Sequence, residues 1–437
     1  MHKLQAKGTQ ILNLFSQTKY FFVLIGYLAF VSSKGTHNSD NFVMWISGFL
    51  DGDFFPLYHT VPYQGVLASE SLMVPYPPLS LYILGVVAKV IVFFAGDSSN
   101  AILIATNLTS IIFTFMTAGL LAFLGRTYSI MSPVLYLLTP VVFLISPILG
   151  YQDSIMSFFV LAAFIAAEKK SWALSAAMAA MAVLTKQLAV MPIFGLGLIV
   201  LLTLQWRIII RFTITFLLIS ATILSPFILT GTLPAYFRAQ GLASVHTMMS
   251  AQNPNVPWLI GQISRIIDHG IFNAESYSAL PLRIVNDNLR QFLYLSFGAF
   301  SALFILFWFF YWMKKLDGFQ ISPIFAGALA ISSYNLFSFG VHENHAFMLM
   351  PILFAVVGNR QNRKIYVLAS TALAINLIAT SGLGRSLPSV PVLIYESGFL
   401  YCLVSMICLV LYTLALWELW KTRPTLQPLP GKNHPLL

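Results

Sequence analysis

Charged residues are scarce in this chain. Only 9% of its 437 residues are Asp, Glu, Lys or Arg, whereas hydrophobic residues make up 58%. In soluble domains roughly a quarter of the residues are charged, so this composition excludes a soluble globular protein. Cysteine is also rare, because the chain has only Cys402 and Cys408, both inside one apolar run. That position argues against a disulfide or a metal site at these two residues.

The few charges that are present are mostly basic. Lys and Arg number 24 against 14 Asp and Glu, which gives a formal net charge of +10. The basic residues gather in short connectors between apolar runs, as at 168–170, 314–315 and 360–364. Basic residues at span ends mark cytoplasmic loops of membrane proteins. We therefore expect a lipid bilayer around the chain and no nucleic-acid partner.

Apolar runs recur along almost the whole sequence, at lengths near the roughly 20 residues that cross a hydrocarbon core. Alternating barrel strands are absent, so only helices satisfy the backbone in lipid. The sequence predicts an all-α, polytopic helical membrane protein with about 12 to 14 transmembrane helices. The candidate runs are 20–33, 77–95, 100–124, 131–148, 154–168, 171–185, 187–204, 208–231, 291–313, 321–340, 345–358, 365–381 and 395–417.

Two long polar stretches, 34–76 and 232–290, interrupt these runs. If the basic connectors and both termini are cytoplasmic, both stretches face the other side. We expect one membrane domain over 1–420, outer loops at 34–76 and 232–290, and a cytoplasmic tail at 421–437. An odd number of alternating spans would separate the termini. One run between 77 and 148 must therefore be re-entrant, half-spanning or wrongly divided.

This topology collects several polar residues on the outer side. Ionisable groups at membrane depth are costly and usually line a cavity, so their convergence on one face favours a functional site. The candidate site residues are Asp40, Tyr76, Gln152, Asp153, Lys186, Gln187, His342, Glu343, His345 and Arg385.

The first outer loop contains an amphipathic pattern. Phe42, Trp45, Ile46 and Phe49 recur at helical spacing, which predicts a short helix lying in the membrane interface. Asp40 stands near the start of this helix, where it either caps the helix or serves as a base.

Several short motifs follow one another along the chain. They are Asp40 with Trp45, Tyr-Pro-Pro-Leu at 76–79, Gly-Tyr-Gln-Asp at 150–153, Lys-Gln at 186–187 and Val-His-Glu-Asn-His at 341–345. Their order resembles that in the GT-C glycosyltransferases, in particular the dolichyl-phosphate-glucose glucosyltransferases of N-glycan assembly and the bacterial mannosyltransferases related to the GPI pathway. Two positions depart from that pattern. Asn344 stands where Lys is common, and Asp153 stands where the glucosyltransferases usually carry Asn.

The resemblance implies a GT-C fold and inverting transfer of a hexose, mannose or glucose, from a polyprenyl-phosphate sugar donor. The acceptor would be a lipid-linked or other glycan on the non-cytoplasmic face, with no cofactor and no metal. Attack by an acceptor hydroxyl needs a base within hydrogen-bond reach, and Asp40 is the candidate. The departing phosphate develops negative charge, for which His342, Lys186 and Arg385 are candidate partners. The remaining candidate residues are expected to bind substrate.

These residues also allow other interpretations. A lysine at a helix end, such as Lys186, commonly snorkels to the interface, and Arg385 in a loop can anchor at headgroups. His342 and His345, with Glu343 between them, also fit a metal site or a hydrogen-bonded structural pair. In the second outer loop, Trp258 fits either stacking on a sugar or an interfacial anchor.

The sequence also allows two other functions. A secondary transporter or lipid flippase tends to show internal repeats and mid-span charges, whereas here Lys89 is the main mid-span charge and we find no convincing repeat. A non-catalytic scaffold is the other alternative. The second outer loop is too long for an ordinary connector and is expected to cover the cavity as a lid or acceptor-binding element. The compact loops favour a bacterial inner membrane with the site facing the periplasm or exterior, over an endoplasmic reticulum membrane with a luminal site.

Overall fold

The computed structural model describes residues 18–52, 54–55, 58, 74–202, 205–243, 248–278, 280, 282–315, 321–357, 363–381 and 397–422. Within these ranges the regular elements are all helices, and the only β-type pairings are isolated bridges. The all-α prediction is therefore confirmed. The candidate residue Arg385 lies outside the described residues.

The elements follow one another along the chain in the order given next. They are a helix at Thr18–Leu28 and then α2 (His37–Leu50), α3 (Pro78–Ala95), α4 (Ser99–Leu124), α5 (Pro133–Leu137), α6 (Pro140–Phe143), η3 (Leu144–Ile148), α7 (Asp153–Glu168), α8 (Trp172–Thr185), η4 (Gln187–Ala189), α9 (Val190–Leu202), α10 (Trp206–Leu229), α11 (Leu233–Ala243), α12 (Val256–His269), η5 (Ala274–Ser276), α13 (Asp287–Lys315), α14 (Pro323–Phe337), η6 (His345–Met348), α15 (Leu349–Val356), α16 (Arg363–Ser381) and α18 (Gly398–Lys421).

Six helices in the described part of the chain are long and apolar enough to cross a membrane: α3, α4, α10, α13, α16 and α18. Shorter apolar helices accompany them, among them α8 and α14. The surface also fits a bilayer, because α10 and α13 expose large apolar side chains such as Leu218 at 62% and Phe307 at 63%. The protein is thus a polytopic helical membrane protein.

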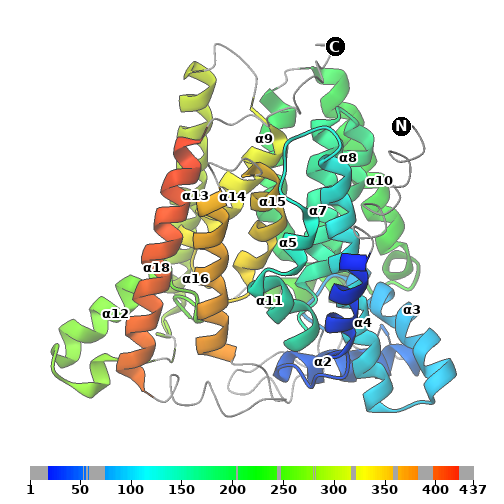
Figure 1. The fold of residues 1–437 in the computed structure, drawn as a ribbon, viewed down its shortest axis with the longest axis horizontal. Coiled ribbons are helices and arrows are strands. Elements are labelled where there is room, and N and C mark those ends of the chain that lie inside the picture. The colour runs from blue at the N-terminus through cyan, green and yellow to red at the C-terminus, as the bar shows by residue number, and fades with distance from the viewer. Residues whose placement is uncertain are drawn as a thin grey trace, which may run out of the picture.

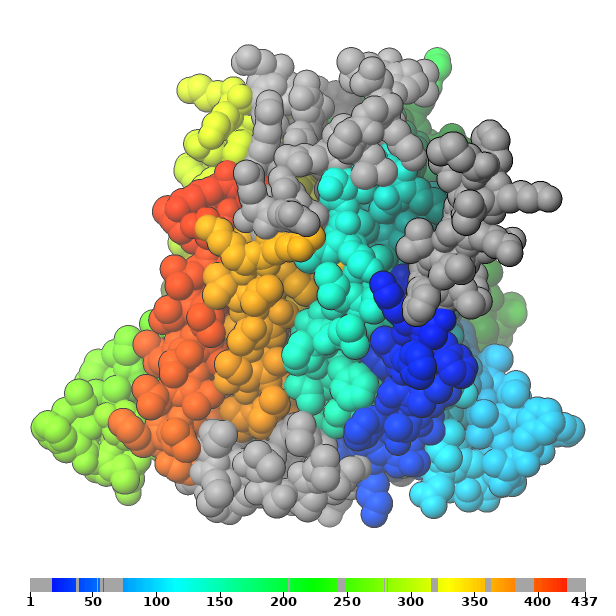
Figure 2. Space-filling model, viewed as in Figure 1, coloured from blue at the N-terminus to red at the C-terminus, as the bar shows by residue number. Residues whose placement is uncertain are grey.

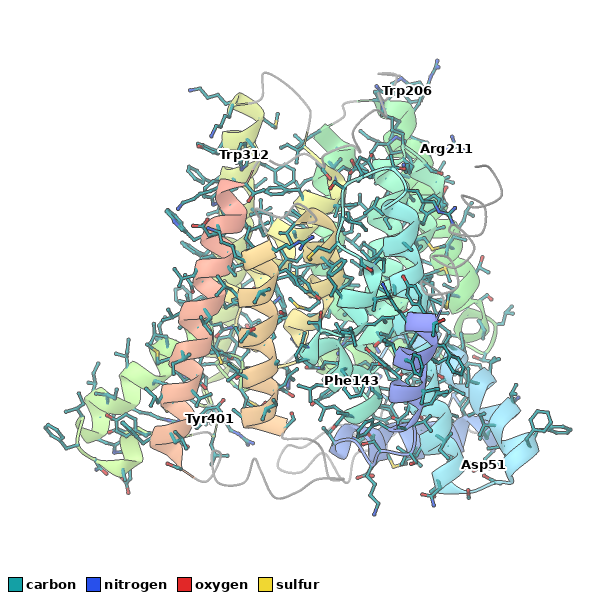
Figure 3. All side chains as sticks on the ribbon, viewed as in Figure 1. Asp51, Phe143, Trp206, Arg211, Trp312 and Tyr401 are labelled. Atoms are coloured by element: carbon teal, nitrogen blue, oxygen red, sulfur yellow. The ribbon has the colours of Figure 1, made fainter. Side chains whose placement is uncertain are left out.

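Most of the long helices run roughly parallel, so the bundle has two ends (Figure 1). We call the end that carries α2 the lower end. Figure 3 places Trp206 and Arg211, at the start of α10, and Trp312, near the end of α13, towards the upper end. Asp51 and Tyr401 lie at the lower end. The start of α10 and the end of α13 therefore lie at the end of the bundle opposite Asp51.

Helix α3 lies beside the α2 region. In its first half, Tyr82 lies 5.1 Å from the ring of Phe54, and in its second half Lys89 Nζ lies 5.6 Å from the ring of Phe49. Both aromatic residues belong to the α2 region at the lower end, where Figures 1 and 2 also show α3. Helix α3 is therefore packed against the α2 region at the lower end of the bundle.

The run predicted as one helix at 131–148 is divided into three short pieces, α5, α6 and η3. Each piece contains a proline: Pro133 and Pro140 begin α5 and α6, and Pro147 lies inside the π-helical η3. A proline lacks the backbone donor and clashes with the preceding turn, so it starts a helix well but interrupts one. The single continuous helix predicted there is wrong.

The amphipathic helix predicted in the first outer loop is present as α2. Its apolar residues do not face lipid, because Phe42, Trp45 and Ile46 are at most 4% exposed. Gly85 of α3 lies directly against the ring of Phe49, where a larger residue would not fit. The apolar face of α2 therefore packs against the rest of the protein.

Candidate functional site

A buried charge pair joins two of the sequence motifs. Lys186 Nζ lies 2.9 Å from Asp153 Oδ1, and the two side chains are only 12% and 1% exposed. Asn344 Nδ2 donates a hydrogen bond of 2.9 Å to the other carboxylate oxygen, Oδ2. Asp153 is thus held by a cation on one side and an amide on the other.

The motif at 76–79 meets the same pair. Lys186 Nζ lies 5.7 Å from the ring centroid of Tyr76, a distance at which a cation is attracted to an aromatic face. Gln187 Nε2 donates to the backbone oxygen of Pro75 at 3.1 Å. Residues from 75 to 344 therefore converge at one place.

Each of these side chains comes from the end of a helix. Tyr76 precedes α3, Asp153 is the first residue of α7, Lys186 follows α8 with an extended backbone, and Asn344 precedes η6. A carboxylate in the first turn of a helix is favoured by the helix dipole. The local sequence thus ends or starts a helix at each of these positions, and the packing of the bundle brings the ends together.

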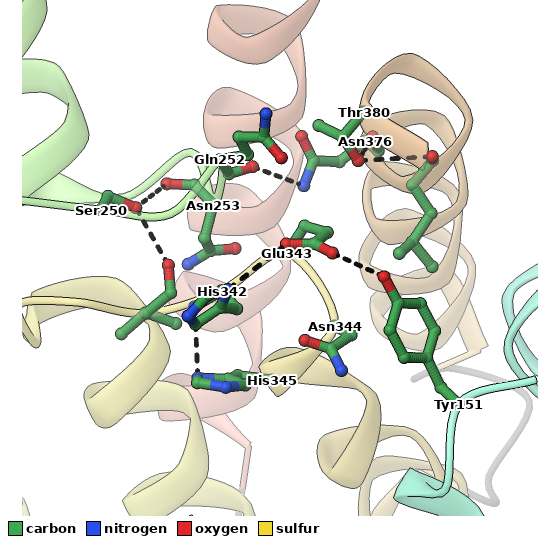
Figure 4. Close-up of polar contacts among 12 residues, drawn as sticks. Tyr151, Ser250, Gln252, Asn253, His342, Glu343, Asn344, His345, Asn376 and Thr380 are labelled. Atoms are coloured by element: carbon green, nitrogen blue, oxygen red, sulfur yellow. Dashed lines mark hydrogen bonds and ion pairs between the residues drawn. The ribbon is translucent and has the colours of Figure 1, made fainter. Parts of the chain in front are cut away.

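A second group of contacts surrounds Glu343 (Figure 4). The Tyr151 hydroxyl donates to Glu343 Oε1 at 2.8 Å, and His342 Nδ1 lies 3.9 Å from Glu343 Oε2. His345 Nδ1 accepts the backbone N–H of His342 at 3.2 Å. Of the interpretations open for this motif, the local hydrogen-bonded histidine pair is present. Among the described residues, no group of three or more His, Cys, Asp or Glu side chains has an arrangement that would hold a metal ion.

Burial controls the ionisation of this cluster. Burial raises the pKa of Glu343, although the hydrogen bond from Tyr151 works in the opposite direction. Burial alone would lower the pKa of Lys186, but the adjacent Asp153 carboxylate outweighs this effect, and the net pKa is raised. Lys186 therefore stays protonated, and its charge is matched by that of Asp153.

A small pocket opens at the charge pair. It is lined by Phe42, Tyr76, Ser80, Tyr151, Gln152, Asp153, Thr185 and Lys186. The rings of Phe42 and Tyr76 are stacked with centroids 5.4 Å apart, so one wall is aromatic and the other is polar. Within the described part of the chain, the buried side-chain oxygens of Gln152 and Gln187 accept no hydrogen bond. Buried acceptors of this kind usually bind water or a ligand.

Asp40 is close in sequence to a residue that lines this pocket, but it does not line the pocket itself. It is exposed in the first turn of α2, two residues before the pocket residue Phe42. The two acids inside the cluster are instead Asp153 and Glu343. The role of Asp40 as a base therefore stays a prediction.

The cluster contains two residues that we did not select as site residues from the sequence. Tyr151 and Asn344 both belong to the quoted motifs, and each bonds to a buried carboxylate. The one feature of the sequence that pointed to these two residues was their position next to Gln152 and Glu343. We missed them because a tyrosine or asparagine next to a charged residue is not distinctive without its partner.

The second polar stretch supports the loop that carries His342. The backbone N–H of Ala251 donates to Val341 at 2.9 Å, and the side chains of Asn253 and Asn255 donate to the backbone oxygens of Asn335 and Ser338. The segment that contains Ala251, Asn253 and Asn255 therefore holds the backbone next to the His342 motif in place. Trp258, at the start of α12, is only 5% exposed. It lines a second small pocket together with Met249, Ser250 and Gln252. Stacking of Trp258 on a sugar therefore stays a prediction.

The sequence has no match to any protein-family model and none to any curated protein. The resemblance to the GT-C glycosyltransferases therefore rests on the motifs alone. In the structure, contacts join the motifs that begin at 76, 150, 186 and 341.

Proposed function

We propose that the protein is an inverting membrane glycosyltransferase of the GT-C type, with about 12 to 14 transmembrane helices. It transfers mannose or glucose from a polyprenyl-phosphate sugar to a lipid-linked or other glycan acceptor on the non-cytoplasmic face. A bacterial inner membrane, with the site towards the periplasm or exterior, fits the compact loops. One observation carries the proposal: four motifs spread over more than half of the chain meet at one aromatic and polar pocket.

The reaction requires few protein groups. An acceptor hydroxyl attacks the anomeric carbon while Asp40 takes its proton, and the bond from that carbon to the phosphate oxygen breaks. The polyprenyl phosphate leaves with the bonding electron pair. Lys186, His342 and Arg385 are the cations or hydrogen-bond donors assigned to this phosphate, since charge that develops in the transition state is best met by preorganised donors.

The walls of the pocket carry groups that would contact the sugar of such a donor. The stacked rings of Phe42 and Tyr76 offer an apolar wall, and the free amide oxygen of Gln152 can accept a hydrogen bond from a sugar hydroxyl. Ligand sites commonly combine aromatic walls with a few fixed polar groups in this way.

The test is transfer of labelled mannose or glucose from synthetic polyprenyl-phosphate sugars by the purified protein in liposomes. We expect Asp40→Asn to reduce transfer by about 100-fold or more, the usual contribution of a general base. Asp51→Asn is the matched control, because Asp51 is an exposed acid just after the same helix. Near-normal transfer by Asp40→Asn would remove Asp40 as the base. No transfer by the unmodified protein with either donor would reject the proposed reaction.

The rival function is a secondary transporter or lipid flippase. One observation favours it: the buried pair of Lys186 and Asp153 resembles the paired charges along transport pathways. The same liposomes separate the two functions. Movement of the lipid-linked sugar between leaflets without sugar transfer would support the rival.

A further inference from the structure

Helix α12 has one buried face and one exposed apolar face. Trp258, Gly261 and Gln262 are buried against the protein. Ile263 and Ile267 are 47% and 77% exposed. Residues at this spacing form one stripe along a helix, so the exposed stripe is apolar along its length.

The apolar surface continues beyond the end of α12. Phe272, in the turn after the helix, is fully exposed at 101%, and its neighbour Ile271 is 58% exposed. Figures 1 and 2 show this segment projecting sideways from the lower end of the bundle. An exposed phenylalanine at the tip of such a projection is unfavourable in water.

Helix α12 is attached to the candidate membrane span α18. Cys402 Sγ donates to Gln262 Oε1 at 3.3 Å, and the rings of Tyr277 and Phe399 lie 5.2 Å apart. Phe399 is 60% exposed and begins the outer apolar stripe of α18, which continues through Leu403 at 48% and Ile407 at 49%. The apolar surface of α12 is therefore continuous with the face that α18 presents to lipid.

The polar residues of this segment occupy other sides. Arg265 donates through its guanidinium to the backbone oxygens of Ser278 and Leu280, and His269 Nδ1 lies 3.5 Å from Glu275 Oε2. Asp268 is exposed and lies about 100° around the helix from Ile267. A helix with apolar and charged sides, lying beside a membrane span, is typical of an interfacial helix.

We propose that α12 lies in the lipid leaflet at the lower end, with Ile263, Ile267 and Phe272 inserted among the acyl chains. This inference does not depend on the proposed reaction. The opposite lower corner carries a comparable surface, since Phe93 and Phe94 at the end of α3 are 81% and 80% exposed. The leaflet thus holds the molecule on both sides of the pocket.

The position of α12 also fixes the depth of the candidate site. The segment just before α12 bonds to the loop that carries His342, through the backbone N–H of Ala251 and the side chain of Asn255. Anchoring α12 at the leaflet surface therefore holds this loop, and the pocket next to it, at a set depth. A substrate with a lipid tail would reach the pocket from that leaflet.

Spin labels test this placement in the full chain reconstituted in lipid nanodiscs. Labels are attached at Ile267→Cys and Phe272→Cys, with Asp268→Cys as the matched control on the same helix. The native Cys402 and Cys408 are buried, and the unmodified protein gives the labelling background. We expect labels at 267 and 272 to collide more with oxygen, which concentrates in lipid, and the label at 268 to collide more with a water-soluble nickel chelate.

Two results would overturn the inference. One is equal nickel accessibility of all three labels, which would place the apolar face in water. The other is strong dipolar broadening between labels at 267 of different molecules, which would show that a second copy covers this face. If Phe272→Cys does not fold, Ile271→Cys replaces it, because that residue is also exposed on the projecting turn.

Discussion

Asn344 donates a hydrogen bond of 2.9 Å to Asp153, although 191 residues separate them in the chain. These are the two positions at which the sequence departs from the glycosyltransferase motifs. The departures are therefore coupled: the acid at 153 is accompanied by an amide at 344 that donates to it. Lys186 contacts the other oxygen of the same carboxylate. The Asp153 carboxylate is thus balanced by the charge of Lys186 and receives a hydrogen bond from Asn344.

The buried pair of Lys186 and Asp153 leads to a prediction about charge removal. Loss of one member of a buried ion pair leaves the other uncompensated and typically costs about 3 to 5 kcal/mol, whereas replacing both with uncharged residues costs much less. We expect Lys186→Met and Asp153→Asn each to lower the melting temperature in detergent more than the double variant does. Losses that simply add in the double variant would contradict this coupling.

The same double variant also reports on catalysis through a transfer assay. If Lys186 contacts the donor phosphate, as proposed, the double variant folds but does not regain transfer activity. If Lys186 only neutralises Asp153, activity returns together with stability. The stability result therefore stands even if the proposed reaction is wrong.

A second prediction concerns the pH dependence of stability at Glu343. Burial raises the pKa of Glu343 above the value of 4.5 for an unfolded glutamate, so the folded protein holds this proton more tightly. The contribution of Glu343 to stability is therefore present at low pH and is lost as the pH rises through the folded pKa. The side chain in the Glu343→Gln variant has no titrating proton, and its amide oxygen can still accept the hydrogen bond from the Tyr151 hydroxyl. Its melting temperature relative to the unmodified protein should rise as the pH increases from 4.5 and level off above the folded pKa of Glu343.

The control for this experiment is Asp97→Asn, which removes an exposed carboxylate in the turn between α3 and α4. Its melting curve should follow that of the unmodified protein over the same pH range. A constant difference between Glu343→Gln and the unmodified protein at all pH values would show that Glu343 is not buried as an acid.

A third prediction concerns the packing of α14 against α7. A Cβ atom at Gly327 would lie 2.6 Å from Phe164 Cζ, and Phe164 is completely buried. We expect Gly327→Ala to destabilise the protein by about 1 to 3 kcal/mol, as overpacking usually does. Gly119→Ala in α4 is the control, because a Cβ there meets open space. It should stabilise the helix by roughly 0.5 to 1 kcal/mol. A rise in melting temperature for both variants would show that α7 and α14 are packed more loosely than described.

Local patterns predicted some elements well. The periodic apolar residues of α2 gave both the existence of this helix and its inward residues Phe42 and Ile46. They did not reveal what the apolar face would meet, because protein and lipid are equally apolar partners. The same limit applies to α3, whose apolar length is that of a membrane span although it lies beside α2.

The sequence by itself determined that this chain is helical and belongs in a membrane, because composition and periodicity are properties of neighbouring residues. It also indicated the short polar motifs at 76–79, 150–153, 186–187 and 341–345. Only the tertiary structure decided that Lys186 pairs with Asp153 and that Tyr151 bonds to Glu343. Such contacts join helix ends that are far apart in the chain, so they depend on how the helices pack, which no local pattern specifies.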